Sequence, residues 1–373
     1  MTMTLRERAL AVYRGETPDV VPWFADLSHW HAANSGAEFL PFTGETLDPT
    51  MLDLHRKVQA GVYLYTGQPY DIKYVDGVQS TIEVEPTPQG NVSHWQLETP
   101  LGTIEEQRIF SQASYSWNIK RRMVQSVDDL KVLRYAMERR EYVPRFERYT
   151  EWADQCGDLG LPYANMPYSG FGFLISRGMG IQRTIYAAAD APDEVRKTVD
   201  VINENNLQCV DLLARGPAPV ILFSDNFSAD VQPPRVIEKW SAAYYREAFH
   251  RLHEHGKWAS VHIDGRLRGL LRKFAALGAD DADAVTPAPM GDLTPEECRA
   301  DAGPDLILWG GIPPSAWSRT APDEVFIKAI MDWLAIRRLS PRLVIAPGDQ
   351  VPPDTDYYRI EMVAELVEKH GRY

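Results

Sequence analysis

The sequence is poor in cysteine, and the cysteines it has are far apart. Cys156, Cys209 and Cys298 are the only three in 373 residues, and none forms a C-x-x-C pair. Isolated cysteines at such distances favour neither a disulfide framework nor a metal site built from thiolates. We therefore expect a fold that depends on its hydrophobic core rather than on covalent or metal cross-links.

Long apolar runs and a surplus of positive charge are also missing. No stretch of 18 apolar residues occurs, and the first residues, M-T-M-T-L-R-E-R, lack the apolar core of a signal peptide. We expect a cytoplasmic protein with no membrane association. The chain has 39 Lys and Arg against 52 Asp and Glu, a net charge of −13, which argues against nucleic acid or an anionic membrane as partner.

Signals for several domains are absent as well. No G-x-G-x-x-G follows an early strand, which removes the main argument for a dinucleotide-binding domain, and no internal repeat or low-complexity linker divides the chain. What the chain does contain is ample core material, with 44% hydrophobic and 24% charged residues. We predict one domain over residues 1–373.

Strand and helix patterns alternate along most of the chain. About eight apolar strands are expected, each followed by a helix or a long loop, which favours a single (β/α)₈ TIM barrel of the α/β class. Residues 72–112 instead alternate with period two between Pro and Gly turns, which predicts an antiparallel β-hairpin insertion near the N-terminus. The expected strands cover residues 20–24, 61–71, 158–166, 217–225, 258–261, 282–286, 306–310 and 343–346.

One strand ends in side chains that can bind protons or metal. Lys257–Gly265 reads K-W-A-S-V-H-I-D-G, a short buried strand that delivers His262 and Asp264 at its carboxyl end. The two residues are two positions apart and so lie on the same face of an extended chain. In α/β enzymes the carboxyl ends of parallel strands hold the reactive groups, which makes this pair the first candidate site.

Five segments of the chain stand in the order known from one protein family: L-R-E-R-A-L-A-V-Y-R-G-E-T-P-D-V-V-P-W, T-P-L-G-T, S-V-D-D-L-K-V-L, H-I-D-G and P-G-D-Q-V-P-P-D-T. Through them the chain resembles the uroporphyrinogen decarboxylase superfamily along nearly its whole length. The resemblance is strongest to the branch of corrinoid-dependent methyltransferases, which move a methyl group between a cobalamin protein and a thiol or tetrahydrofolate. The resemblance implies a single (β/α)₈ barrel.

The chain departs from true uroporphyrinogen decarboxylases in its N-terminal segment. Those enzymes carry arginines there for the carboxylates of their substrate, whereas this chain reads P-W-F-A-D-L-S-H-W, without an arginine. An acidic protein without matching cations is poorly suited to a porphyrinogen with many carboxylates. The resemblance therefore favours the methyltransferase branch over porphyrinogen decarboxylation.

The family resemblance also implies a metal site, which is altered here. Thiol-specific relatives hold zinc with a His-x-Cys pair and a distant cysteine, and the matching positions of this chain are His262, Asp264 and Asp349. One nitrogen and two oxygens suit Zn²⁺ with an open position, or a harder ion such as Mn²⁺. Alternatively, no metal binds and the aspartates hydrogen-bond a polar heterocycle such as the pterin of tetrahydrofolate.

Further residues at strand ends are predicted to line the substrate pocket. An Asp–Asn pair offers both acceptors and donors to a pterin ring, so the residues after the 217–225 strand are the expected folate contact. The aromatic residues of the first strand border the same pocket, and the family resemblance places substrate after the third strand. These predicted substrate-binding residues are Asp225, Asn226, Trp23, Phe24, Tyr168 and Ser169.

Two other groups of polar residues are interpreted as structural. His250, His253 and His255 resemble a metal cluster, but they fall in the last turn of a helix, where cations complement the helix dipole. Asp281 and Asp283 are interpreted as part of a solvated turn.

Three functions are consistent with these features. The first is a corrinoid-dependent methyltransferase in which His262, Asp264 and Asp349 activate the acceptor, directly or through a metal. The second is a decarboxylase or related lyase acting on a small carboxylic acid or a porphyrinogen, and the third is a non-catalytic corrinoid- or folate-binding protein. The resemblance implies a partner protein that carries the corrinoid, and a homodimer.

Overall fold

Six parallel strands form the main sheet of the protein. The computed structural model describes residues 3–35, 48–62, 67–111 and 116–373. The strands lie in the order β14-β13-β12-β11-β10-β9, so strands that follow one another along the chain are also neighbours in the sheet. Almost all of their residues are buried, which explains their continuous apolar sequences. The bounds are β9 Ala164–Met166, β10 Val220–Phe227, β11 Trp258–Ile263, β12 Asp281–Val285, β13 Ile307–Ile312 and β14 Leu343–Pro347.

Two short parallel strands complete the set of eight. β1 (Phe24–Ala25) pairs with β2 (Gly61–Val62) in a separate two-stranded sheet. Isolated bridges connect this pair to both edges of the main sheet, from Trp23 to Ile345 on one side and from Val62 to Gly160 and Gly67 to Ala164 on the other. The described residues thus follow the strand order of a (β/α)₈ barrel, but with single bridges instead of continuous ladders at the two joins.

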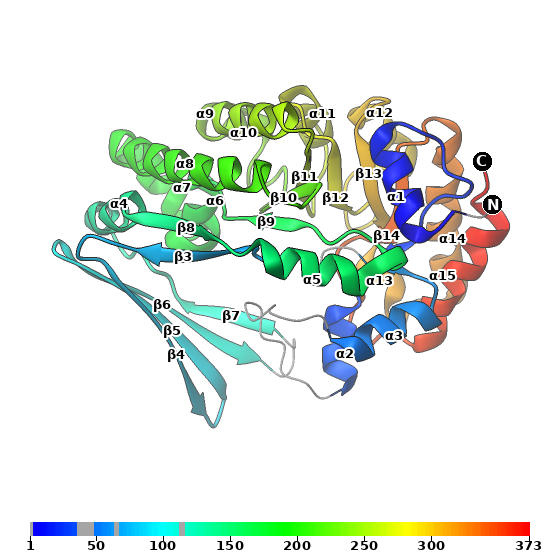
Figure 1. The fold of residues 1–373 in the computed structure, drawn as a ribbon, viewed down its shortest axis with the longest axis horizontal. Coiled ribbons are helices and arrows are strands. Elements are labelled where there is room, and N and C mark those ends of the chain that lie inside the picture. Colours follow the sequence, from blue (N-terminus) through cyan, green and yellow to red (C-terminus); the bar gives the residue numbers. More distant parts are fainter. Residues whose placement is uncertain (1–2, 36–47, 63–66, 112–115) are drawn as a thin grey trace.

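Helices follow nearly every parallel strand and cover its outer side (Figure 1). The predicted capping box at the start of α12 is present, because the Thr294 hydroxyl accepts from the Glu297 amide and the Glu297 carboxylate accepts from the Thr294 amide. The helices are α1 Leu5–Arg14, α2 Ser28–Ser35, α3 Pro49–Lys57, α4 Leu130–Glu138, α5 Phe146–Cys156, α6 Gly170–Phe173, α7 Ile181–Asp190, α8 Pro192–Ala214, α9 Pro234–Trp240, α10 Ala242–Glu254, α11 Leu270–Leu277, α12 Pro295–Ala302, α13 Pro314–Trp317, α14 Asp323–Ala335 and α15 Tyr357–His370, with short helical turns η1 Val127–Asp129, η2 Gly157–Leu159, η3 Leu174–Gly178 and η4 Ile336–Arg338.

A second, antiparallel sheet extends from one end of the molecule, at the lower left of Figure 1. Its four strands pair in sequence order, and buried side chains from β5 and β6 pack against α4. It occupies the region where a hairpin insertion is predicted, but it has four strands and extends past residue 112. Its strands are β4 Gln79–Thr87, β5 Gly90–Thr99, β6 Gly102–Ser111 and β7 Ser116–Arg121.

Two of the predicted strands are shorter or split in the structure. The segment predicted as a strand over 158–166 begins with η2, and only Ala164–Met166 is a strand, since Pro162 has no N–H to contribute to a ladder. The segment 61–71 contains β2 and the start of β3 (Tyr70–Tyr74), which pairs with β8 (Arg140–Pro144) rather than with the parallel strands. Residues 63–66 lie outside the described residues.

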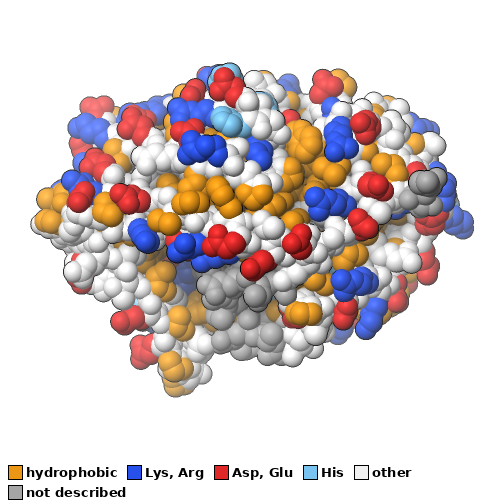
Figure 2. Space-filling model, viewed as in Figure 1, with side chains coloured by type: hydrophobic (Ala, Val, Ile, Leu, Met, Phe, Trp, Pro, Cys, Tyr) orange, Lys and Arg blue, Asp and Glu red, His pale blue; other side chains and the backbone are white. Residues whose placement is uncertain are grey.

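The surface is mixed in charge. Figure 2 shows acidic and basic side chains interspersed over one face, with hydrophobic side chains between them. Within the described ranges, no helix combines the length and the hydropathy that crossing a membrane requires.

Candidate active site

A histidine and an aspartate on neighbouring strands form the centre of the candidate site. His262 on β11 is the register partner of Asp283 on β12. The imidazole Nδ1 lies 2.8 Å from a carboxylate oxygen of Asp283. His262 is 8% exposed and Asp283 only 1%, so the carboxylate is sealed while the imidazole keeps some access to solvent. This is the arrangement in which a buried acid orients an imidazole towards a ligand.

The imidazole of His262 is held in its charged form. Burial by itself lowers the pKa of His262, but the hydrogen bond to Asp283 and the charges of Asp283, Asp349 and Asp264 outweigh burial and raise this pKa to about 9. At neutral pH both ring nitrogens therefore carry a proton. Nδ1 donates to Asp283, and Nε2 makes no hydrogen bond within the described part of the chain. The Nε2–H is a donor available to a ligand.

The charges of Asp264 and Asp349 act on His262, and the charge of Asp26 acts on Asp349. Asp264 follows β11, Asp349 follows β14 and Asp26 follows β1. Burial raises the pKa of Asp349 to about 6, with the His262 charge opposing this shift and the charges of Asp264, Asp26 and Asp283 adding to it. The structure therefore brings together the three residues on which the metal prediction rests, and it adds Asp283 and Asp26 to them.

Asp26 fixes the loop that carries Asp349. One carboxylate oxygen of Asp26 accepts from the Ser28 amide at 2.9 Å, and the other accepts from the Gln350 side chain at 3.1 Å. The Asp26 carbonyl also accepts from the amide of Val351 at 3.0 Å. Burial raises the pKa of Asp26, and the hydrogen bonds from Ser28 and Gln350 oppose that shift. The ends of β1 and β14 are thus tied together beside the site.

The chain's donor set does not fit a metal ion. Among the residues that the structure describes, no group of three or more His, Cys, Asp and Glu side chains is placed so as to hold one. The geometry therefore gives the zinc or manganese prediction no support.

Asp225 and Asn226 lie at the carboxyl end of β10 in very different surroundings. Asp225 is 2% exposed, and its carboxylate accepts from the amide of Ser169 at 2.9 Å and from the Tyr245 hydroxyl. Burial raises the pKa of Asp225 to about 6, against the hydrogen bonds of Ser169 and Tyr245. A Cβ atom on Gly172 would lie 2.6 Å from this carboxylate, so helix α6 packs directly on it. Asn226 is exposed and has a positive φ of 49°.

Three of the four remaining predicted substrate contacts are buried. Phe24 is fully buried and packs edge-on against Trp309, with ring centroids 5.0 Å apart. Trp23 is 2% exposed and stacks on Trp317. Ser169 is buried and caps α6. Tyr168 is half-buried, and its substrate contact, like that of the others, stays a prediction.

The histidines near the end of α10 do not meet at a common point. His250 lies 3.6 Å from Glu254, His253 lies 2.8 Å from Asp280, and His255 contacts a backbone carbonyl. Each has its own partner, as the structural interpretation predicts.

The interpretation of Asp281 and Asp283 as a solvated turn is wrong. Both belong to β12 and are buried, with exposures of 0% and 1%. Asp281 accepts from the hydroxyl of Ser260 at 2.5 Å and from that of Tyr13. The D-D-A-D sequence resembles a loop because acidic residues are rare inside strands. The sequence feature that could have revealed the buried strand is the period-two spacing of Asp281 and Asp283. This spacing puts both side chains on one face of β12, the face on which Asp283 meets His262 of β11.

Comparison with known proteins identifies the family. Residues 164–370, more than half of the chain, match the family model described as uroporphyrinogen decarboxylase (URO-D). The chain belongs to this family. The segment that matches the family model runs from β9 to α15. It therefore contains His262, Asp264, Asp283 and Asp349. The antiparallel sheet lies before it. No curated protein matches the sequence.

Comparison with solved structures shows that this chain shares its fold with a known protein. A methyltransferase from Methanosarcina mazei is similar with a TM-score of 0.62 at 14% identity, over 98% of this chain and 99% of that one. A 3-dehydroquinate dehydratase from Geobacillus kaustophilus gives a TM-score of 0.28 at 16% identity, over 64% and 77% of the two chains. At these identities the first similarity establishes a common fold, and the second carries no further weight.

Proposed function

We propose that the protein is a methyltransferase that exchanges a methyl group between a small methylated compound and a corrinoid carried by a partner protein. The observation that carries this proposal is the charged His262, held by buried Asp283 with its Nε2–H directed away from that partner. Family membership and the fold shared with a methyltransferase support it. A charged N–H donor can protonate a poor leaving group as its bond to the methyl group breaks.

The chain's own residues would act on the leaving heteroatom. When a methyl group is transferred from nitrogen, oxygen or sulfur, the bonding electron pair stays on that heteroatom. The Nε2 proton of His262 transfers to this pair as the bond breaks. Asp283 keeps the imidazole oriented and charged before the transfer. The corrinoid of the partner protein would supply the methyl acceptor. No step requires a metal, in keeping with the poor fit of the donor set.

The charge of the site selects the substrate class. The imidazolium of His262 interacts with Asp264, Asp283 and Asp349, and Asp26 adds its charge beside Asp349, which leaves an excess of negative charge when these carboxylates are ionised. Such a site favours a cationic or hydrogen-bond-donating compound, and it repels a substrate with several carboxylates. Methylated amines meet this requirement, and so does the pterin ring of methyltetrahydrofolate through its N–H groups.

The experiment that tests the proposal follows the colour of the corrinoid. The purified protein is mixed with reduced cobalamin and, in separate reactions, a methylated amine, a methylated thiol or methyltetrahydrofolate, and the visible spectrum is recorded. We expect methyl-cobalamin to form with the amine or the folate and not with the same mixture containing His262→Ala. Absence of methyl transfer with every donor, from protein that is folded and supplied with both free and protein-bound corrinoid, would reject the proposal.

One observation favours a second function. A buried imidazolium can also stabilise a carbanion-like state and protonate it. A decarboxylase acting on a small carboxylic acid requires both effects. Release of CO₂ from candidate acids separates this lyase activity from methyl transfer. The surrounding carboxylates disfavour it, because they repel an acid substrate.

A further inference from the structure

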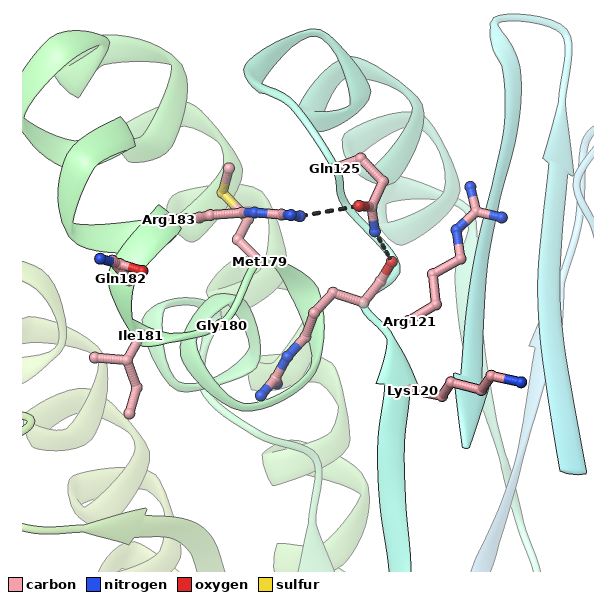
Figure 3. A pocket seen from close by; sticks show the side chains of 9 residues that line it. Lys120, Arg121, Gln125, Met179, Gly180, Ile181, Gln182 and Arg183 are labelled. Atoms are coloured by element: carbon pink, nitrogen blue, oxygen red, sulfur yellow. Dashed lines mark hydrogen bonds between the residues drawn. The ribbon is translucent and has the colours of Figure 1, made fainter. Parts of the chain in front are cut away.

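A cavity lies between the end of β7 and the start of α7. Its volume is about 330 Å³, and Figure 3 shows the side chains around it. The volume is near the lower limit for small-molecule sites, which is enough for a compact group rather than a large cofactor. The cavity is lined by Lys120, Arg121, Arg122, Gln125, Met179, Gly180, Ile181, Gln182 and Arg183.

The lining of this cavity is basic, in contrast to the chain as a whole. Lys120, Arg121, Arg122 and Arg183 are four of its nine residues, and none of the nine is acidic. The full chain has 52 acidic against 39 basic residues. A concentration of positive charge on an acidic protein raises the local concentration of anions and repels cations.

Three of these four cations form no direct ion pair with a described carboxylate, although the charge of Glu106 acts on Arg122. Arg121 pairs with Glu105 at 2.9 Å. Across the described residues, no carboxylate lies within ion-pair distance of Lys120, Arg122 or Arg183. Arg183 donates to the neutral side chain of Gln125 at 2.9 Å, a contact drawn in Figure 3.

The guanidinium of Arg122 is fixed in place by the backbone. It donates to the carbonyl of Ser176 and, at 3.4 Å, to that of Ile175. A Cβ atom on Gly180 would lie 3.2 Å from Nε of Arg122, and Gly180 has a φ of 84°, so a glycine is needed for this approach. Burial lowers the pKa of Arg122, the charge of Glu106 opposes this shift, and the charges of Arg177 and Arg183 add to it. An anion bound here would reduce the repulsion from the two arginines.

The first turn of α7 adds backbone donors to the same wall. Gly180 is the N-cap of this ten-residue helix and provides no capping side chain. The first N–H groups of a helix have no intrahelical acceptor, and the helix dipole favours negative charge at that end. Ile181, Gln182 and Arg183, which carry these groups, all line the cavity.

We infer that this cavity binds a phosphate group, either as inorganic phosphate or diphosphate or as part of a small phosphorylated metabolite. Unpaired guanidinium and ammonium groups supply charge-assisted hydrogen bonds, and the start of α7 supplies N–H donors for the remaining oxygens. Methyl transfer at His262 does not use this cavity, so the inference stands apart from the proposed function.

Calorimetry with inorganic diphosphate tests the inference. The probe is titrated at low ionic strength into wild-type protein, a Lys120→Gln/Arg183→Gln double variant and an Arg235→Gln control, in which a different exposed arginine is replaced. We expect one site per chain, unchanged affinity in the control, and affinity lower by about tenfold in the double variant. Both replaced side chains are exposed, so the fold is kept, and circular dichroism checks this.

A second titration distinguishes the two sources of phosphate. Tighter binding of a nucleoside diphosphate than of inorganic diphosphate assigns an organic phosphate, and equal or weaker binding assigns the inorganic ion. The inference is overturned if diphosphate gives no saturable heat, or if the double variant binds it as tightly as wild type. Neither result bears on methyl transfer, because no activity is measured.

Discussion

Two buried aspartates on the strands that flank β11 have opposite surroundings. Asp283 on β12 is joined to the imidazole of His262, and its second oxygen, Oδ1, has no hydrogen-bond partner among the described residues. Asp225 on β10 is enclosed by the Ser169 amide, the Tyr245 hydroxyl and helix α6. Asp283 orients an imidazole that still reaches solvent, whereas Asp225 fixes the start of helix α6 through the Ser169 amide.

The difference shows that position at a strand end does not decide what an acidic side chain does. Both aspartates lie near the carboxyl edge of the same sheet, where barrel enzymes keep their reactive groups. The two aspartates differ in whether the group hydrogen-bonded to the carboxylate keeps a second N–H or O–H that can donate to a ligand. The Nε2 of His262 has one, and the partners of Asp225 direct their protons at the carboxylate itself.

Removing the imidazole should have the largest effect. We expect His262→Ala to lower the rate of methyl transfer by about 10²- to 10⁴-fold, the usual contribution of a positioned acid or base. The rate is measured from the spectrum of the corrinoid, with thermal unfolding followed by circular dichroism. Arg235→Gln, at an exposed position on α9, serves as the control and should keep its activity. A loss of fold in His262→Ala would contradict the functional assignment.

Removing the enclosed aspartate should affect stability instead. Asp225→Ala leaves the buried Ser169 amide and Tyr245 hydroxyl without an acceptor, and we expect the free energy of unfolding to fall by about 3 kcal/mol. Denaturant unfolding measures the change. If Asp225→Ala is as stable as wild type but no longer binds a folate, then Asp225 is a substrate contact, as the sequence predicts.

The elevated pKa of His262 makes a prediction about pH. In the unfolded chain this group titrates near 6.5, and in the folded chain near 9, so its ion pair stabilises the fold fully below 6.5 and is lost as the pH rises through 9. The rate of methyl transfer should decline over the same upper range, because the acid form is consumed. Unfolding and rate profiles from pH 6 to 10 check both effects, and a rate that rises above pH 9 would exclude His262 as the acid.

Neutralising Asp349 should have the smallest effect. Asp349→Asn removes one of several negative charges near His262, and we expect about a tenfold weaker apparent affinity for a cationic substrate with little change in kcat. Steady-state kinetics separates the two parameters. An equal loss with a neutral substrate would point to a role in loop structure rather than in charge.

Much of the parallel sheet could be predicted from the sequence. Continuous apolar runs mark strands that are buried on both faces, so β10, β11, β13 and β14 lie where the sequence expects them. The segment at 158–166 was predicted too long because apolar residues near a proline resemble a strand. The pairing of β3 with β8 was not predictable, since the two segments are far apart along the chain.

The candidate site was predictable only in part. His262, Asp264 and Asp349 could be identified from their positions after apolar strands and from the family resemblance. Asp283 was missed because its importance depends on the register between β11 and β12, which no local pattern encodes. For the same reason the sequence could not show that Asp225 is enclosed by Tyr245, twenty residues further along the chain.

Titration of His262 by nuclear magnetic resonance tests the central claim most directly. The imidazole signal is assigned by its absence in His262→Gln and is followed over pH in wild type and in Asp283→Asn. We predict a pKa of about 9 in wild type, because the hydrogen bond and the nearby carboxylates favour the charged form, and a clearly lower pKa once the Asp283 charge is removed. A wild-type pKa near the ordinary 6.5, unchanged in Asp283→Asn, would contradict a charged imidazole held by Asp283.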